Sequence, residues 1–173
     1  MTLATTTRRN IARRIGRLRR RFGWFAVDFT VVTNDPTWFD EGAARIRTGW
    51  IGDAGVWLTD DGRVLLIRHA DDPDRWAIPG GGHEPGEPMT ATARRELAEE
   101  TGVTGTFTSV RYARMKTVLR ETDPRDRFHL LTVVFAGTYE DGTIEIDDPE
   151  VLACRWFEDL PDALAPFVSD HVR

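Results

Sequence analysis

Three glycines followed by an acidic helix pattern constrain the fold of this chain more than any other feature. Residues 80–103 read GGGHEPGEPMTATARRELAEETGV. Pro88 suits the first turn of a helix and Gly102 suits the position just past its end, so the pattern predicts a helix over residues 88–101. Three glutamates of this helix have the spacing i, i+3 and i+4, which puts their side chains on one face: Glu96, Glu99 and Glu100.

The crowded glutamates need a physical reason, because like charges on neighbouring turns of a helix repel by about 0.2–0.5 kcal/mol per pair. A divalent cation reverses the sign of that interaction, and Mg²⁺ or Mn²⁺ prefers oxygen ligands. A solvated acidic helix face is the alternative. The glycines at 80–82 favour the cation, because glycine lets a backbone approach closely and a carbonyl of this loop could complete the metal shell.

The same stretch resembles the Nudix box at every defined position. Gly81 is followed after five residues by Glu87, and after seven more by the run RELAEETGV, which ends at Val103. The segments WAIPGG before the box and RWF (155–157) after it also resemble the family, so the resemblance spans about residues 49–160. It implies an α/β/α sandwich with a mixed sheet. It also implies a hydrolase that uses Mg²⁺ or Mn²⁺ to cleave a diphosphate linked to another, usually nucleotide-derived, moiety.

The resemblance implies a role for each residue of the box. Glu99 and Glu100 would be the main metal ligands, and the Gly80 carbonyl would be a further ligand. Glu96 would be a metal ligand or the general base that takes a proton from water. Family members differ in which carboxylate is the base, so that role stays open. The other motif residues would be structural, with Arg95 paired to Glu87: Gly81, Glu87, Arg95 and Gly102.

Residues outside the box extend the candidate site. Many family members carry a further acid before the strand with RWF, and we choose Glu150 as this metal ligand, with Asp147 and Asp148 as alternatives. Arg68 resembles a position that contacts substrate phosphate, although a solubilising charge at a strand end is equally plausible. Trp76 adjoins the glycine loop and could stack on a base, with core packing as the alternative. We assign three histidines to hydrogen-bonded packing, with metal binding as the alternative: His69, His83 and His129.

Charge is divided unevenly along the chain. Residues 1–24 hold eight arginines and no acid, and removing this +8 from the net charge of −5 leaves −13 on the other 149 residues. The acidic remainder argues against a nucleic-acid groove. Residues 8–25 have the pattern of a basic amphipathic helix, which we expect to dock on that remainder or on a second copy of the chain in a homodimer. Contact with an anionic membrane or nucleic acid, or a cleaved targeting peptide, are the alternatives.

We expect an α/β fold in two parts, an N-terminal helical extension (1–47) and a Nudix-type domain (48–173). Strands are expected in five segments of the second part: 49–59, 63–70, 105–119, 127–140 and 153–159. Residues 120–126 are expected to form a polar loop, residues 26–46 a connector with a short helix, and residues 160–172 a terminal helix. The hairpins among these strands indicate a mixed sheet.

These features predict a metal-dependent hydrolase of the cytoplasm that acts on a nucleotide-derived small molecule. The single cysteine, Cys154, fits a reducing compartment, and no apolar run approaches the ~18 residues that a membrane span needs. Marker residues of the family members that cleave ADP-ribose, dinucleoside polyphosphates, or NADH and coenzyme A are missing. A nucleoside triphosphate or a nucleotide sugar remains as the substrate. The alternative is a non-catalytic nucleotide-binding or regulatory module, which has no need for the full carboxylate set.

Overall fold

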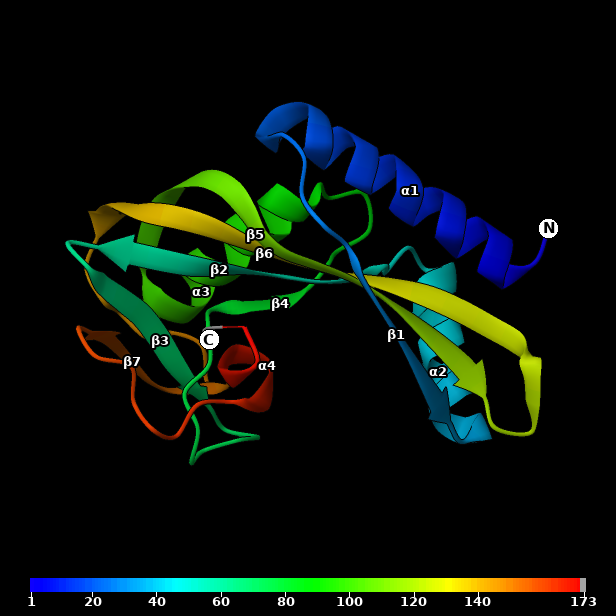
Figure 1. The fold of residues 1–173 in the computed structure, drawn as a ribbon. Helices are drawn as coiled ribbons and strands as arrows, with labels where there is room; N and C mark the ends of the chain where they lie inside the picture. The colour runs from blue at the N-terminus through cyan, green and yellow to red at the C-terminus, as the bar shows by residue number, and fades with distance from the viewer. Residues whose placement is uncertain (172–173) are drawn as a thin grey trace.

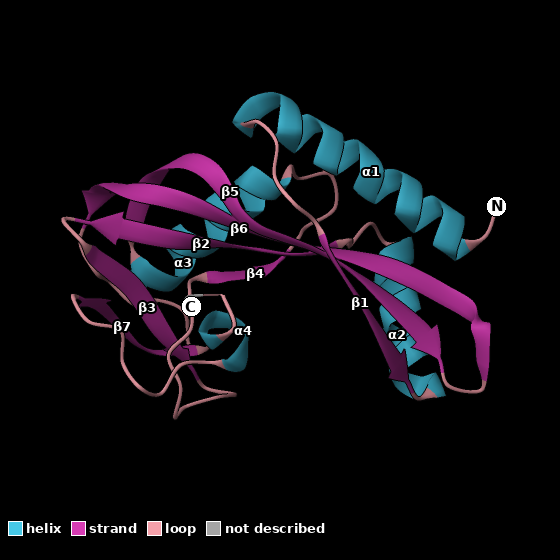
Figure 2. Ribbon diagram, in the orientation of Figure 1, coloured by secondary structure: helices cyan, strands magenta, loops and turns pink. Residues whose placement is uncertain are grey.

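The computed structural model describes residues 1–171, which form one mixed sheet with helices on both faces (Figures 1 and 2). The helices are α1 (Leu3–Phe22), α2 (Pro36–Arg47), α3 (Met89–Thr101) and α4 (Pro166–Ser169). The strands are β1 (Asp28–Asn34), β2 (Gly52–Asp60), β3 (Arg63–His69), β4 (Gly80–Gly82), β5 (Val103–Arg120), β6 (Asp123–Gly142) and β7 (Val151–Phe157). None of these helices has the length and apolar character needed to cross a membrane.

The strand order in the sheet is β1-β5-β6-β2-β3-β7, and β4 pairs with β2 beside β3. β1 runs parallel to β5 and β2 runs parallel to β6, whereas the other pairs are antiparallel. The predicted mixed sheet is therefore confirmed. The side chains of β6 alternate between the two faces. Leu131, Val133 and Phe135 join the core under α1 and α3, whereas Phe128 and Leu130 pack under α2.

The β5–β6 hairpin is longer than the sequence indicates. Pairing continues to Arg120 opposite Asp123, so the expected loop at 120–126 is reduced to a tight turn. The polar composition of residues 120–126 suggests a loop. The two ends of this segment are extended instead, because β6 pairs with β5 and β1 pairs with the other edge of β5. β2 begins at Gly52, opposite Leu131, so the outer end of the hairpin projects beyond β2 (Figure 1).

The N-terminal helix starts earlier than predicted and packs on the body of its own chain. The Thr2 side chain caps α1 by accepting the Thr5 N–H, and Gly23, with φ 82°, ends it. Ile11 and Leu18 are buried in the main core, beside Leu97 of α3. Docking on the rest of the chain, the first interpretation of this basic helix, is therefore what the structure shows.

Residues 26–47 form more regular structure than the connector that was expected. β1 adds a parallel edge strand to β5, and Asp35 caps α2 by accepting the N–H groups of Thr37 and Trp38. Phe39 of α2 packs against Phe128 with ring centroids 5.0 Å apart. The extension thus shares both a sheet and a core with the residues that follow it.

The C-terminal segment is less helical than predicted. Among the described residues of this segment, only Pro166–Ser169 are helical, and Pro166 begins this helix instead of breaking one. Residues 172–173, which end the predicted segment and domain, lie outside the described residues. The backbone of Trp76 exchanges hydrogen bonds with the segment before α4, donating to Ala163 O and accepting from Ala165 N, both at 2.8 Å.

Candidate active site

Helix α3 has one face buried in the core, which holds its acidic side chains in place. Met89, Ala93 and Leu97 recur every four residues and are almost completely buried. The helix ends at Gly102, whose φ of 73° is left-handed and whose N–H donates to the Ala98 carbonyl. Packing therefore determines which way the other face of α3 points, and that face carries Glu96 and the two following glutamates.

The glycines of β4 allow an unusually close approach to their neighbours. A Cβ atom on Gly80 would lie 2.5 Å from the Gly55 Cα of β2, so only glycine fits between these two backbones. A Cβ atom on Gly81 would lie 2.6 Å from the Glu96 Cδ. The missing side chain of Gly81 thus provides the space in which the Glu96 carboxylate lies.

Glu100 is buried, with 2% of its surface exposed, and both of its oxygens are engaged. Its Oε2 accepts the Gly80 N–H at 2.7 Å, and its Oε1 lies 3.0 Å from His69 Nε2 at the end of β3. The hydrogen bond to Glu100 raises the pKa of His69. Glu100 is therefore held between β3 and β4 by two groups that come from distant parts of the sequence.

Arg95 links the glycine loop to two of the three glutamates. Its Nε donates to Glu87 Oε1 at 3.0 Å and its Nη2 donates to the Gly82 carbonyl at 2.9 Å. Its Nη1 donates to Glu96 Oε1 at 2.8 Å and to Glu99 Oε2 at 3.2 Å. The Arg95 guanidinium, with a hydroxyl and a backbone donor, lowers the pKa of Glu87 to about 2. The structural pair that the sequence suggests is present, and the same arginine also orients Glu96 and Glu99.

The glutamates present excess negative charge in a partly dry setting. Burial raises the pKa of Glu96, and the charges of Glu100 and Glu99 add to this effect, although Arg95 opposes it. Glu99 is more than half exposed. Hard carboxylate oxygens with uncompensated charge are the donor chemistry that suits Mg²⁺ or Mn²⁺. Within residues 1–171, however, no three acid, histidine or cysteine side chains converge as a ready metal cage.

The candidate residues outside the box differ in their surroundings. The Glu150 carbonyl accepts the Ala70 N–H at 2.8 Å, and the Glu150 charge helps to raise the pKa of His69, so this acid lies on the Glu100 side. The Arg68 guanidinium lies over the ring of Trp76, 4.9 Å from its centroid. Trp76 is only 9% exposed and packs edge-on against Phe157, which favours core packing over base stacking.

The partner of His69 was not identified from the sequence. His69 was assigned to hydrogen-bonded packing, and its hydrogen bond is to Glu100, 31 positions further along the chain. Its place at the end of the second predicted strand was the only available signal, because nothing in the local pattern pairs that strand end with the acidic helix. Cys154 also lies near Glu100, and burial together with this negative charge raises its thiol pKa to about 12, which argues against a nucleophile.

Comparison with known proteins places this arrangement in context. A family model described as NUDIX domain matches residues 51–171. An RNA pyrophosphohydrolase of Novosphingobium aromaticivorans is 32% identical over 139 residues, covering 65% of this chain and 81% of that protein. Nucleoside triphosphatase NudI of Escherichia coli is 49% identical over 49 residues, covering 26% of this chain and 35% of that protein. The crystal structure of a MutT NUDIX hydrolase from Burkholderia pseudomallei has 25% identity and a TM-score of 0.52, covering 71% of this chain and 98% of that one.

Proposed function

The chain belongs to the Nudix family of pyrophosphohydrolases, and we propose that it uses Mg²⁺ or Mn²⁺ to hydrolyse a diphosphate bond in a nucleoside triphosphate or a related nucleotide. One observation carries the proposal. The carboxylates of Glu96, Glu99 and Glu100 share one face of α3, and two of them lie directly against the glycine strand β4. A module that only bound nucleotides would have no need for three acids whose mutual repulsion has to be offset.

The proposed ligands of the cation are Glu99, Glu100, the Gly80 carbonyl and Glu150, with Glu96 as a further ligand or as the general base. When bound, a divalent cation neutralises the charge of the diphosphate and makes a water molecule more acidic. Glu100 is already oriented by the Gly80 N–H and by His69. Its side chain therefore loses little conformational freedom when it binds the cation. Glu99 is more than half exposed and accepts a 3.2 Å hydrogen bond from Arg95, whereas Glu96 lies against Gly81.

Proton transfer from the attacking water requires one of these carboxylates to act as a base. Glu96 is suited to accept a proton, because burial and the neighbouring negative charges raise its pKa. Arg95 keeps the Glu96 carboxylate oriented through its 2.8 Å hydrogen bond. Glu99 has no comparable burial, so we propose ligand binding as its main role.

One of the relatives named above is a nucleoside triphosphatase, which supports a triphosphate as the substrate group. The named nucleoside triphosphatase aligns only over 49 residues, whereas the RNA pyrophosphohydrolase aligns over 65% of this chain. The second alignment extends well beyond the box, and it makes a 5′-triphosphorylated RNA end a second candidate substrate. We propose the free nucleoside triphosphate first, because the net charge of −5 does not favour a long polyanion.

Full-length protein is to be incubated with GTP, UDP-glucose and a 5′-triphosphorylated RNA oligonucleotide, in Mg²⁺, in Mn²⁺ and in EDTA, while released phosphate and pyrophosphate are measured. We expect turnover of at least one triphosphate with metal and none in EDTA. Glu99→Gln is expected to lower kcat by about 10²-fold or more, since it removes a charged ligand. Glu41→Gln, at an exposed helix position of α2, serves as the control and should keep full activity.

Two results would contradict the proposal. Full activity of a folded Glu99→Gln protein would show that the acidic face of α3 is not the catalytic site. Metal-dependent nucleotide binding without turnover of any of the three substrates would favour the binding or regulatory module instead. Cleavage of the RNA but not of GTP would favour the 5′-triphosphorylated RNA end over the free nucleoside triphosphate as the substrate.

A further inference from the structure

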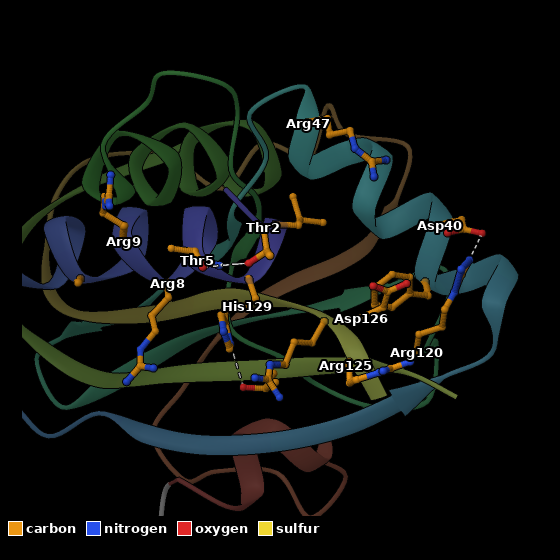
Figure 3. Close-up of a pocket in the computed structure, with 16 residues that line it drawn as sticks. Thr2, Thr5, Arg8, Arg9, Asp40, Arg47, Arg120, Arg125, Asp126 and His129 are labelled. Carbon is orange, nitrogen blue, oxygen red and sulfur yellow. Dashed lines mark hydrogen bonds and ion pairs between the residues drawn. The ribbon is translucent and has the colours of Figure 1, made fainter. Parts of the chain in front are cut away.

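An open cavity of about 900 Å³ lies at the outer end of the β5–β6 hairpin, between α1 and α2 (Figure 3). Six arginines line what we call the arginine cavity: Arg8, Arg9, Arg47, Arg120, Arg125 and Arg127. Two aspartates, Asp40 and Asp126, and His129 line it as well. The three box glutamates are not among its lining residues. The cavity is therefore a feature separate from the candidate active site.

The walls of the arginine cavity are built by packing and hydrogen bonds. Among residues 1–171, no strand pairs with the part of β6 that precedes Leu131 on its β2 side, because β2 starts at Gly52. α1 lies beside this free edge, where the His129 N–H donates to Thr7 Oγ1 at 3.1 Å. α2 is fixed nearby by the contact between Phe39 and Phe128. The two helices leave a hollow between them, and each helix is held in place by these contacts with the hairpin.

Most of the positive charge in the cavity has no acidic partner. Arg120 pairs with Asp40, and Arg125 pairs with Asp123 at 2.9 Å. The other four arginines have no carboxylate within 4.0 Å among residues 1–171: Arg8, Arg9, Arg47 and Arg127. In a chain whose net charge is −5, such a concentration of unpaired cations does not follow from composition. Bringing them together costs free energy that a bound anion would offset.

Two further groups of the lining bear on the binding of an anion. His129 is buried, and burial together with the charges of Arg8 and Arg127 lowers its pKa. Its Nδ1 is 2.9 Å from Thr117 Oγ1, which also lines the cavity. The Arg120 Nε is buried and lacks a hydrogen-bond acceptor among the described residues.

We propose that the arginine cavity is a second anion-binding site, which takes a small compound with two or more phosphate groups. Guanidinium groups donate paired hydrogen bonds that match phosphate oxygens, and several arginines from α1, α2 and β6 surround the hollow. Its volume lies within the range of about 300–1,000 Å³ that is typical of small-molecule sites, which is more room than one phosphate needs. The proposal does not depend on the reaction catalysed at the box.

The test is calorimetric titration of the full-length protein with inorganic tripolyphosphate, in EDTA so that no metal-bound anion reaches the box glutamates. Orthophosphate is titrated alongside. We expect saturable binding of tripolyphosphate that is at least tenfold tighter than that of orthophosphate. The double variant Arg8→Gln/Arg127→Gln removes unpaired cations from two walls of the cavity and is expected to weaken tripolyphosphate binding at least tenfold.

The control is Arg13→Gln/Arg20→Gln, which removes the same charge from exposed positions of α1 outside the cavity and is expected to change affinity less than twofold. Thermal unfolding checks that each variant is folded. If Arg8→Gln/Arg127→Gln is unstable, Arg9→Gln/Arg47→Gln takes its place and is expected to weaken tripolyphosphate binding at least tenfold. Equal weakening in the control would mean general charge attraction and would overturn the proposal. So would the absence of saturable binding, or binding of a 5′-hydroxyl oligonucleotide without tripolyphosphate binding.

Discussion

Replacing Gly81 by alanine offers a direct test of how closely the Glu96 carboxylate must be positioned. Gly81 is not among the glycines with positive φ, so its backbone can accept an alanine without conformational strain. The new Cβ would lie 2.6 Å from both Cδ and Oε2 of Glu96 and 2.8 Å from Oε1. Contact at about 3.5 Å is comfortable, so the carboxylate has to move by about 1 Å.

The magnitude follows from which atoms have to move. The displaced group is the end of a flexible side chain and not a backbone, so we expect a loss of stability of about 1 kcal/mol or less. For a chain of this size that corresponds to a fall in Tm of about 2–4 °C. A misplacement of about 1 Å in a catalytic group costs on the order of 10²-fold in rate, and we expect that fall in kcat.

The assay compares the metal-dependent turnover of three single variants and one double variant with that of the parent protein. Gly82→Ala is the matched control, because its Cβ would meet only Arg45 and Trp50 atoms at 3.8 Å, an ordinary contact distance. It should keep both activity and Tm. Glu96→Gln is combined with Gly81→Ala in a double-mutant cycle, and we expect little further loss when Gly81→Ala is added to Glu96→Gln.

Several results would refute this reasoning. A folded Gly81→Ala protein with kcat within twofold of the parent would show that the position of Glu96 is not critical. An equal loss in Gly82→Ala would point to a general disturbance of β4. If Gly81→Ala lowered kcat as much in the Glu96→Gln protein as in the parent, Gly81 would act through a group other than Glu96.

Two further predictions concern stability. Glu87 has a pKa of about 2 in the folded protein and an ordinary value of 4.5, so its contribution to the free energy of unfolding is present above about pH 4.5 and is lost as the pH falls toward 2. Urea unfolding across this range should show a shallower decline for Glu87→Gln than for the parent, and an unchanged decline would contradict the assignment. Ile11→Ala is expected to lower the free energy of unfolding by about 2–5 kcal/mol because Ile11 is 1% exposed in the main core. The exposed neighbour Arg13→Ala should stay within about 0.5 kcal/mol, and a similar loss in both variants would argue against a docked α1.

Local features of this protein were predictable because they depend on residues close in sequence. The helix of the box begins within one residue of its predicted start and ends at the predicted Thr101, since Pro88 and Gly102 act through their own backbone preferences. The pairing of Arg95 with Glu87 spans eight residues across one helix start and was also within reach. The amphipathic pattern of the N-terminal segment identified a helix, although it placed the start five residues too late.

Features that depend on distant residues were not predictable in the same way. The parallel pairing of β1 with β5 joins residues more than 80 positions apart, and no short pattern specifies it. The polar tip at 120–126 has the composition of a loop, yet neighbouring strands keep it extended. The role of His69 depends on where β3 ends relative to α3, which follows only from the path of the whole sheet.

The sequence by itself determined the family, the acidic face of α3 and the glycines that precede it, because helical spacing and backbone freedom are local properties. Only the tertiary structure decided how that face is used. It set Glu100 between Gly80 and His69, and it placed the Glu96 carboxylate against Gly81. It also gathered arginines from three separate segments around one cavity. The physical reason is that such contacts depend on how the chain packs, and charges far apart in sequence meet only after the core has formed.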